Sequence, residues 1–221
     1  MINLDYTEHL VTDVRIINND LFELILERGE LEFMPGDCTA VYTDSDKSRP
    51  YSISSGSKED ELRFLIRKME GGEVSPWLME RQAGDVIRIT PPFGWFRPGQ
   101  DIGNAPFVFL ATGTGIAPFL SYLNTFERPA EQCLYGIRRK ADAVGFSKLN
   151  NWCPTQLAIS QEDGHEHHHG RITELLDTLP LDAETHYYCC GLESMVNEAT
   201  ERLQQKGIKL MQIHREVFFH G

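Results

Sequence analysis

The hydrophobic pattern of the chain changes character near its middle, and this change constrains the fold more than any other feature. Up to Thr90, apolar and polar residues alternate in short β-branched runs divided by turn residues, a pattern typical of a small antiparallel β-barrel. From Phe107 onward, apolar runs alternate with helical segments, which predicts an α/β domain with a doubly wound parallel sheet. The 221 residues suffice for two domains, and we place these at residues 1–101 and 102–221.

The individual elements follow from this pattern. In the first domain the expected strands are 11–17, 21–27, 38–43, 49–54, 61–67 and 85–90. In the second domain the expected strands are 107–111, 133–137, 156–160, 186–190 and 208–213, and the expected helices are 117–126, 142–149, 173–179 and 193–206. Ligands of such α/β sheets bind at the carboxyl ends of the strands.

The composition argues against several classes of binding partner. The sequence holds 33 acidic and 21 basic residues, a net charge of −12, whereas nucleic acids and anionic membranes are bound through concentrated basic surfaces. Its five cysteines show no CxxC spacing, so we expect free thiols, a reducing compartment and a cytoplasmic location. We expect neither a membrane span nor a secretory leader.

A tetrapeptide on the fourth expected strand, Arg49-Pro50-Tyr51-Ser52, has the residue types of a flavin site. Side chains two apart share one face of a strand, so Arg49 and Tyr51 are expected to point the same way. A guanidinium there can bind a pyrophosphate while the flat ring covers an isoalloxazine, and Ser52 can hydrogen-bond the N5 region of the flavin. The alternative is an ordinary barrel strand with a surface arginine and a core tyrosine.

A second segment, 71–78, follows the next strand with two glycines and a short helix. Ser75 suits the N-cap of that helix and Pro76 suits its first position. The glycines let the backbone approach a ligand closely, and the exposed amides at a helix start suit a phosphate. This segment and Arg49 could therefore reach the same pyrophosphate, although a capped structural helix after a tight turn is the alternative.

The segment Gly113-Thr114-Gly115-Ile116-Ala117-Pro118 lies where the first strand of the second domain ends and a helix begins. A pyrophosphate loop needs this position. The motif reads G-x-G-x-x-P and lacks the third glycine of the ordinary dinucleotide fingerprint, so a standard Rossmann loop is not expected.

Two further strand ends carry candidate residues. Arg138 and Arg139 end the second strand of this domain, where basic groups favour the 2′-phosphate of NADPH. Cys190 ends the strand 186–190 and is expected at the same edge of the sheet as Gly113. Its thiol could lie beside a nicotinamide ring, or it could be a buried structural cysteine.

Read in order, these segments, with Cys190-Gly191 and Glu216-Val217-Phe218, resemble the ferredoxin-NADP reductase superfamily over nearly the whole chain. The resemblance implies an FAD-binding barrel followed by a nicotinamide-binding α/β domain, with hydride passing from NAD(P)H to flavin N5 and electrons then passing to a protein carrier. The implied FAD ligands are Arg49, Pro50, Tyr51, Ser52, Gly72, Glu73, Val74 and Ser75. The implied nicotinamide-nucleotide ligands are Gly113, Thr114, Gly115, Pro118 and Gly191, and the implied catalytic residues are Ser52, Cys190 and Glu216.

The chain departs from the family pattern at two places. NADPH-preferring members often have an arginine directly after the serine that ends the third strand, whereas here Gln161 follows Ser160, which favours NADH or mixed use. Ser160 is still expected at the nucleotide, and Arg138 favours NADPH, so the choice between NADP and NAD stays open. Many members end in one aromatic residue that covers the flavin, and here Phe218 and Phe219 are both candidates.

The electron acceptor is expected to be a separate protein, ferredoxin or flavodoxin, or a small oxidant, because no CxxxxCxxC run for a [2Fe–2S] cluster occurs. Such carriers are commonly acidic, and an acidic reductase needs a local basic patch to meet them. The candidates for that patch are Arg63, Arg67, Lys68 and Arg97, and scattered solvated charges are the favoured alternative. Two other functions stay open: an NAD(P)H-dependent flavin or quinone reductase, and a flavin-bearing electron-transfer subunit of a larger enzyme.

A histidine-rich segment, 163–170, follows Ser160 closely. Imidazoles and carboxylates are metal ligands, but a loop offers no fixed spacing, so no metal site is predicted. One hypothesis is that protonatable imidazoles of His167, His168 and His169 take a 2′-phosphate in place of the missing arginine.

Overall fold

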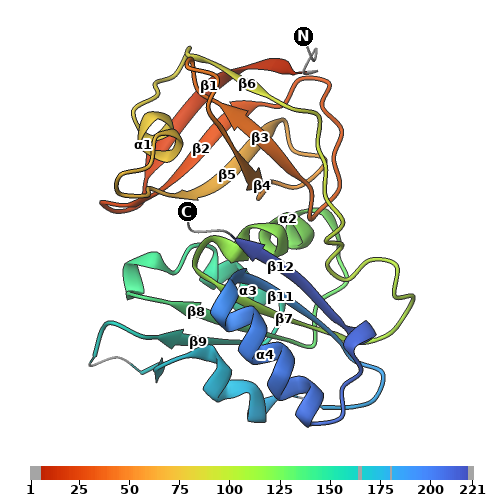
Figure 1. The fold of residues 1–221 in the computed structure, drawn as a ribbon. Coiled ribbons are helices and arrows are strands. Elements are labelled where there is room, and N and C mark those ends of the chain that lie inside the picture. Colours follow the sequence, from red (N-terminus) through yellow and green to blue (C-terminus); the bar gives the residue numbers. More distant parts are fainter. Residues whose placement is uncertain (1–5, 164–165, 180, 219–221) are drawn as a thin grey trace.

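The first domain is an antiparallel barrel of six strands (Figure 1). The computed structural model describes residues 6–163, 166–179 and 181–218. The barrel strands are β1 (Thr7–Ile16), β2 (Leu21–Glu27), β3 (Cys38–Tyr42), β4 (Ser48–Ser52), β5 (Glu61–Arg67) and β6 (Val86–Ile89), and helix α1 (Val74–Met79) follows β5. They pair in the order β4-β3-β6-β1-β2-β5, and a bridge between Ile53 and Phe64 joins the segments at the two edges. The predicted barrel is therefore confirmed.

The second domain is a parallel sheet of six strands, in the order β10-β9-β8-β7-β11-β12. Its strands are β7 (Phe107–Thr112), β8 (Gln132–Ile137), β9 (Thr155–Ile159), β10 (His168–His169), β11 (His186–Leu192) and β12 (Ile213–Phe218). Its helices are α2 (Ala117–Thr125), α3 (Phe146–Trp152) and α4 (Glu193–Gln205). Short 3₁₀ helices are η1 (Gly113–Ile116), η2 (Lys140–Asp142), η3 (Ile172–Thr178) and η4 (Leu210–Gln212).

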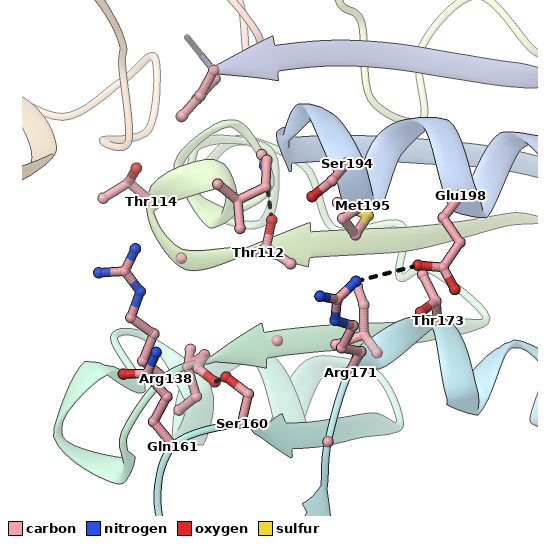
Figure 2. Close-up of a pocket in the computed structure, with 18 of the residues that line it drawn as sticks. Thr112, Thr114, Arg138, Ser160, Gln161, Arg171, Thr173, Ser194, Met195 and Glu198 are labelled. Carbon is pink, nitrogen blue, oxygen red and sulfur yellow. Dashed lines mark hydrogen bonds and ion pairs between the residues drawn. The ribbon is translucent and has the colours of Figure 1, made fainter. Parts of the chain in front are cut away.

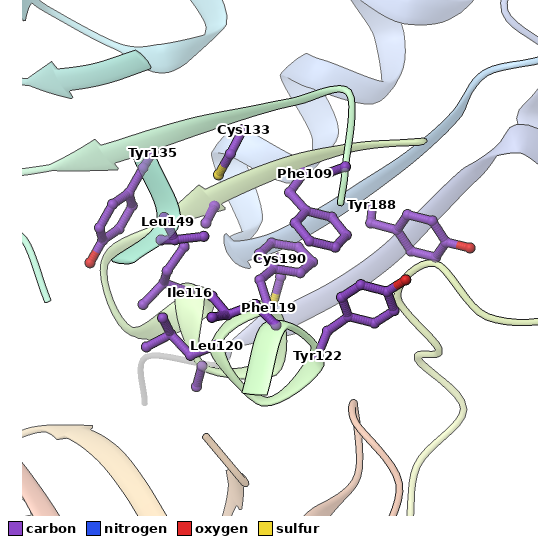
Figure 3. Close-up of a cluster of buried hydrophobic side chains, with 14 of the residues drawn as sticks. Phe109, Ile116, Phe119, Leu120, Tyr122, Cys133, Tyr135, Leu149, Tyr188 and Cys190 are labelled. Carbon is purple, nitrogen blue, oxygen red and sulfur yellow. The ribbon is translucent and has the colours of Figure 1, made fainter. Parts of the chain in front are cut away.

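Both faces of this sheet are covered, as the doubly wound prediction requires. Side chains of β7 alternate between the faces, since Phe109 packs in the apolar cluster under α2 and α3 while Val108 packs in the cluster under η3 and α4. Figure 3 shows the first cluster, in which the ring of Phe119 on α2 stacks 4.2 Å from that of Phe109. Among the described residues, no helix is both long and apolar enough to cross a bilayer.

The two domains share apolar and polar contacts. Leu21, Leu65 and Phe96 belong to the same buried cluster as the α2 face of the second domain. The Phe96 ring lies 5.9 Å from that of Phe119 and 5.8 Å from that of Tyr188. The predicted division between residues 101 and 102 stays a prediction, and the apolar core runs across it.

Polar bonds fasten the loop after β4 to α2. The Ser121 hydroxyl donates a hydrogen bond to the Ser55 carbonyl at 2.7 Å, and the Ser57 amide donates to the Thr125 hydroxyl at 3.0 Å. The loop that follows the Arg49 segment therefore rests directly on the helix that follows the Gly113 segment.

Three predicted elements differ from the structure. The strand expected at 208–213 is wrong, because Ile208 packs against the end of α4, Leu210 starts η4, and the strand begins at Ile213. The helix expected at 142–149 begins only at Phe146, because Asp142 is buried and held by ionic contacts. The helix expected at 173–179 is the 3₁₀ helix η3.

Candidate functional site

The candidate flavin residues of β4 lie as the alternation predicted. Tyr51 packs against the barrel core, and burial raises the pKa of its hydroxyl to about 12, while the positive charge of Arg49 acts against this shift. The Arg49 guanidinium donates to the Ser48 carbonyl at 2.9 Å, and no carboxylate of the described residues pairs with it. Arg49 thus keeps an uncompensated positive charge beside the Tyr51 ring.

The turn before α1 lies beside this strand, but its capping differs from the prediction. Helix α1 begins at Val74 with Glu73 at the N-cap, so Ser75 lies inside the helix, where its hydroxyl accepts a hydrogen bond from the Met69 amide at 2.9 Å. The prediction of Ser75 as N-cap is wrong because this bond holds the hydroxyl back toward the preceding loop. Lys47 Nζ lies 4.0 Å from the Glu73 carboxylate and connects the loop before β4 to the turn.

The three predicted catalytic residues belong to two strand pairs, one in the barrel and one in the sheet, that lie near each other where the domains meet. Ser52 is the strand partner of Cys38 in the barrel, and Cys190 is the strand partner of Glu216 in the sheet. Burial and then the nearby Glu216 charge raise the pKa of the Cys38 thiol to about 12, and the same two causes raise the pKa of Cys190. Glu216 is therefore close to residues of both domains.

Cys190 itself is completely buried. Its side chain lies in the apolar cluster with Phe109 and Ile116, and it does not line the cavity described below (Figure 3). Cys190 is therefore a buried cysteine, which was the alternative to a place beside the nicotinamide. Its thiol stays protonated at neutral pH. A role for it in hydride transfer stays a prediction.

Glu216 is a half-buried carboxylate with a cation nearby. Burial raises its pKa, and the positive charge of Arg97 lowers it. Arg97 is itself anchored, since its guanidinium lies 2.7 Å from the buried carboxylate of Asp37. Glu216 therefore carries a larger share of its protonated form than an exposed glutamate would.

A cavity of about 460 Å³ opens at the carboxyl ends of β7, β8, β9 and β11 (Figure 2). This is the edge of the sheet where ligands of doubly wound folds bind. Six of the predicted cofactor residues line it: Gly113, Thr114, Arg138, Ser160, Gly191 and Phe218. Phe219, the other candidate flavin cover, lies outside the described residues.

Gly115 and Pro118, also predicted at the nucleotide, do not line the cavity. A Cβ at Gly115 would overlap the Cys190 carbonyl oxygen, so this glycine allows the loop to pack against the end of β11. Pro118 is buried in the first turn of α2. At Gly113, by contrast, φ is +53° and nothing lies within 4 Å of where a Cβ would stand, so this glycine leaves the approach to the loop open.

Several cavity residues were not predicted as ligands from the sequence. Arg171, Ser194 and Glu198 line the wall opposite Thr114, and an Arg171 nitrogen lies 3.9 Å from a Glu198 oxygen (Figure 2). Ser194 is the second residue of α4, three residues after Gly191, so the helix start at the carboxyl edge of the sheet was an available signal. Arg171 had no such signal in the sequence, because its position beside the ends of β8 and β9 depends on the tertiary fold.

The described histidines of the 163–170 segment do not line this cavity. The His168 Nε2 atom lies 2.9 Å from a Glu174 carboxylate oxygen, and the His169 Nδ1 atom lies 3.1 Å from that of Asp163. Both rings therefore lie beside carboxylates, and the hypothesis that histidines of this segment take a 2′-phosphate stays a prediction. Among the residues the structure describes, no group of three or more side chains could hold a metal ion; Gly164 and His165 are not among them.

Most of the four candidate cations for a basic patch are paired with carboxylates of the described residues. Arg63 pairs with Glu59 and Glu61, and Arg67 pairs with Asp20 and Asp142. With Arg97 bonded to Asp37, only Lys68 of the four candidate cations has no carboxylate partner among the described residues.

Comparison with known proteins identifies both halves. A model of the oxidoreductase FAD-binding domain matches residues 2–97, and a model of the oxidoreductase NAD-binding domain matches residues 109–201. The two halves belong to these two oxidoreductase domain families, and the chain as a whole is similar to the ferredoxin-NADP reductase superfamily. Its cofactors are FAD and a nicotinamide dinucleotide.

Relatives within the superfamily include parts of oxygenase systems. The toluate 1,2-dioxygenase electron transfer component of Pseudomonas putida is 28% identical, over 94% of this chain and 66% of the relative. The propane 2-monooxygenase reductase component of Mycolicibacterium smegmatis is 29% identical, over 87% and 61%. The chain spans 60% to 67% of the length of three such relatives.

A solved structure has the same two-domain fold. The ferredoxin NADP⁺ reductase from Neisseria gonorrhoeae, with bound FAD and NADP, superposes with a TM-score of 0.87 and 22% identity, over 97% of this chain and 99% of that chain.

The residues present fit these cofactors. On the barrel, Arg49, which has no carboxylate partner among the described residues, stands beside the half-buried Tyr51, and this pair suits a pyrophosphate attached to a flat ring system. In the cavity, the open loop at Gly113 and the side chains of Thr114, Ser160 and Arg138 offer donors to a dinucleotide.

Proposed function

We propose that the chain is a reductase that takes hydride from NAD(P)H onto FAD and passes electrons one at a time to a ferredoxin or flavodoxin. By microscopic reversibility the same site also supports the reverse reaction. The observation that carries this proposal is that Glu216, the strand partner of Cys190 in the sheet, acts electrostatically on Cys38, the strand partner of Ser52 in the barrel. Bound FAD supplies the conversion between a two-electron donor and a one-electron acceptor.

In this proposal the barrel holds FAD and the sheet delivers the nucleotide. Arg49 neutralises the pyrophosphate, Tyr51 lies against the flavin ring, and Ser52 donates a hydrogen bond at its reacting edge. Phe218, at the mouth of the cavity, covers the ring until the nicotinamide arrives. Glu216 contributes a carboxylate that orients the nicotinamide amide, and the buried Cys190 packs behind it at the end of β11.

We also propose NADPH as the preferred donor. Arg138 and Arg171 line the cavity on either side of Ser160 (Figure 2). Two guanidiniums and a hydroxyl suit a phosphate dianion, and Arg138 has no carboxylate partner among the described residues. This arrangement supports NADPH despite the glutamine at 161, since Arg171 supplies a second cation from another segment.

The test is a reconstitution in steps. The purified chain is loaded with FAD, mixed with NADPH or NADH without oxygen, and followed by flavin absorbance; a [2Fe–2S] ferredoxin and a flavodoxin are then added in turn. The expected result is flavin bleaching by NADPH and reduction of a carrier. If FAD binds but neither nucleotide bleaches it, the reductase proposal fails.

The names of the relatives favour a second candidate, an electron-transfer component that serves a larger oxygenase. In that case the physiological acceptor is an oxygenase or its dedicated ferredoxin. A flavin reductase is the remaining alternative, and FAD retained through gel filtration at micromolar protein argues against it.

A further inference from the structure

One wall of the nucleotide cavity carries polar groups that the proposed function leaves unused. Thr173, Met195 and Glu198 line this wall, and Ile172 and Leu192 complete it (Figure 2). We name these five residues the η3–α4 wall, because they come from η3, from α4 and from the residue that precedes α4. None of them was predicted from the sequence as a ligand.

The rest of the cavity is assigned to other parts of the dinucleotide. The loop at Gly113 and Thr114 is the proposed pyrophosphate site. Arg138 and Ser160 are proposed at the 2′-phosphate, and Phe218 is proposed at the flavin, where the nicotinamide arrives. The adenine base is the part of the ligand that remains, and the η3–α4 wall is the part of the cavity that remains for it.

The apolar members of the wall suit a flat ring. Ile172 and Met195 are buried in the apolar cluster under η3 and α4, and Leu192 packs against the same cluster. These side chains gain free energy when a heteroaromatic ring covers them, since apolar area is removed from water. They offer no hydrogen-bonding group, so they cannot distinguish one purine from another.

Thr173 adds a hydroxyl group that has no hydrogen-bond partner among the described residues. The residue is 1% exposed, and it lines the cavity. An unpaired hydroxyl is costly to bury, and a ligand atom that pairs with it recovers that cost. A threonine hydroxyl can donate to a ring nitrogen of a base.

Glu198 adds a hydrogen-bond acceptor. Its two carboxylate oxygens lie 3.9 Å from a nitrogen of Arg171 and 3.7 Å from a nitrogen of Arg202. Both distances are longer than a hydrogen bond, so each oxygen can still accept one. Because η3 packs against α4 in one apolar cluster, Thr173 and Glu198 lie on neighbouring elements. The wall thus carries a donor and an acceptor next to an apolar surface.

We propose that Glu198 and Thr173 select adenine as the base of the nucleotide. Glu198 accepts a hydrogen bond from the exocyclic amino group, and Thr173 donates one to the ring nitrogen beside it. This inference rests on the proposed use of the cavity by NADPH. Adenine carries such a donor and acceptor side by side on one edge. Hypoxanthine has a carbonyl oxygen in place of the amino group, and a carboxylate repels that oxygen.

The test uses calorimetric titration of the FAD-loaded protein with NADP⁺ and with nicotinamide hypoxanthine dinucleotide phosphate. The wild type should bind NADP⁺ about 10- to 30-fold more tightly than the analogue. Glu198→Gln should reduce this ratio below about threefold, because the side-chain amide can turn and donate to the carbonyl oxygen of hypoxanthine. The control is Glu201→Gln, which changes an exposed glutamate of the same helix and should keep the wild-type ratio.

The hydroxyl of Thr173 is tested by two replacements of similar size. Thr173→Val removes the hydroxyl and should weaken NADP⁺ binding about 5- to 10-fold. Thr173→Ser keeps a hydroxyl and should bind NADP⁺ within about twofold of the wild type. Equal affinities in the valine and serine variants would mean that the hydroxyl does not contact the base, and would overturn its part in the proposal.

The outcomes separate base selection from the function on which it rests. If the wild type binds both dinucleotides equally, or if Glu198→Gln discriminates as the wild type does, base selection is wrong and the reductase proposal stands. An equal gain in affinity for both ligands in Glu198→Gln also overturns it, because the carboxylate then acts on the phosphate charge. If NADP⁺ does not bind the FAD-loaded wild type, the proposed use of the cavity fails, and base selection fails with it.

Discussion

The Arg67 guanidinium, at the end of β5 in the barrel, lies 3.2 Å from the carboxylate of Asp142 in the second domain. The same guanidinium lies 2.6 Å from Asp20, and the Asn18 amide donates to Asp142 at 2.8 Å. Asp142 is almost fully buried, and Arg67 also lines the nucleotide cavity. One ionic network therefore joins the domains at the edge of the site.

Removing Arg67 should destabilise the protein more than removing an exposed partner. Arg67→Met leaves the Asp142 carboxylate buried without its cation, so we expect the free energy of unfolding to fall by about 2–4 kcal/mol at pH 7. Urea denaturation measures this. The control is Arg15→Met, which breaks an exposed pair with Glu23 and should cost at most about 1 kcal/mol. Equal losses in the two variants would contradict a buried network.

Neutralising Glu216 should stabilise the fold and slow the reaction. Burial raises the pKa of the Glu216 carboxyl, so the folded chain holds this proton more tightly than the unfolded chain does. Stability is therefore lost as pH rises from the ordinary pKa of glutamate through the raised pKa of the folded state. Glu216→Gln removes this decline and should unfold at a higher urea concentration at pH 7. If Glu216 orients the nicotinamide, stopped-flow flavin reduction should slow about tenfold or more. A variant as fast as the wild type would remove Glu216 from the site.

The two glycines of the nucleotide loop should respond differently to alanine. Gly115→Ala forces a Cβ against the Cys190 carbonyl, so we expect a loss of about 2–3 kcal/mol in unfolding free energy. Gly113→Ala meets no neighbour and carries only the cost of its positive φ, about 1–2 kcal/mol, but it narrows the approach to the cavity. Gly113→Ala should therefore be the more stable variant and yet bind nucleotide more weakly, as measured by urea denaturation and calorimetric titration.

The histidine pair at the β11–β12 edge should make stability pH-dependent. His214 stacks 4.2 Å from Tyr188, and its Nε2 lies 2.9 Å from Nδ1 of His186. Burial, and then His186, lower its pKa from 6.5 to about 4. Between these values the unfolded chain binds a proton that the folded chain does not, so stability is complete above pH 6.5 and is lost as pH falls toward 4.

His214→Phe keeps the stacking and removes this titration. Between pH 7 and pH 5 the wild type should lose about 1 kcal/mol more than the variant, after allowance for partial exposure, or roughly 2–4 °C in Tm. Differential scanning fluorimetry at the two pH values measures the difference. Parallel shifts in the two proteins would show that another group controls the acid response.

Neighbouring arginines give a matched test of nucleotide preference. Both arginines are exposed, but Arg138 lines the cavity and Arg139 does not. Arg138→Ala should lower the ratio of kcat/KM for NADPH over NADH about tenfold or more, because a charge-assisted bond to the 2′-phosphate is lost. Arg139→Ala should leave the ratio unchanged. A ratio near one in the wild type would show that the cavity does not select the phosphate.

The architecture could be predicted from the sequence because strands and helices have different hydrophobic periods. The first domain shows short alternating strand patterns, and the second shows apolar strands that alternate with helical segments. It was less informative for β12, where His214, Arg215 and Glu216 interrupt the apolar alternation of an edge strand. The neighbouring run from Ile208 to Ile213 has a stronger β pattern, yet Leu210 and Met211 of that run are exposed.

The placement of a residue was predictable where its position on or directly after its own strand decided it, as for Arg49 and Tyr51 on β4 and Gly113 directly after β7. It was not predictable where two distant segments must meet. Arg171 enters the cavity only because η3 packs on the sheet, and the cations proposed as a carrier patch are neutralised by Asp20, Asp37 and Asp142, which are remote in sequence. Ion pairs of this kind depend on tertiary placement alone.

Phe96 has a consequence for how the molecule comes apart. It comes from the barrel half of the chain, but its ring is part of the apolar cluster of the sheet, together with Leu21 and Leu65. A separately expressed barrel would expose all three side chains to water, and the sheet alone would keep an open apolar hollow. Heating should therefore give a single calorimetric transition, in which flavin and nucleotide halves lose their structure together.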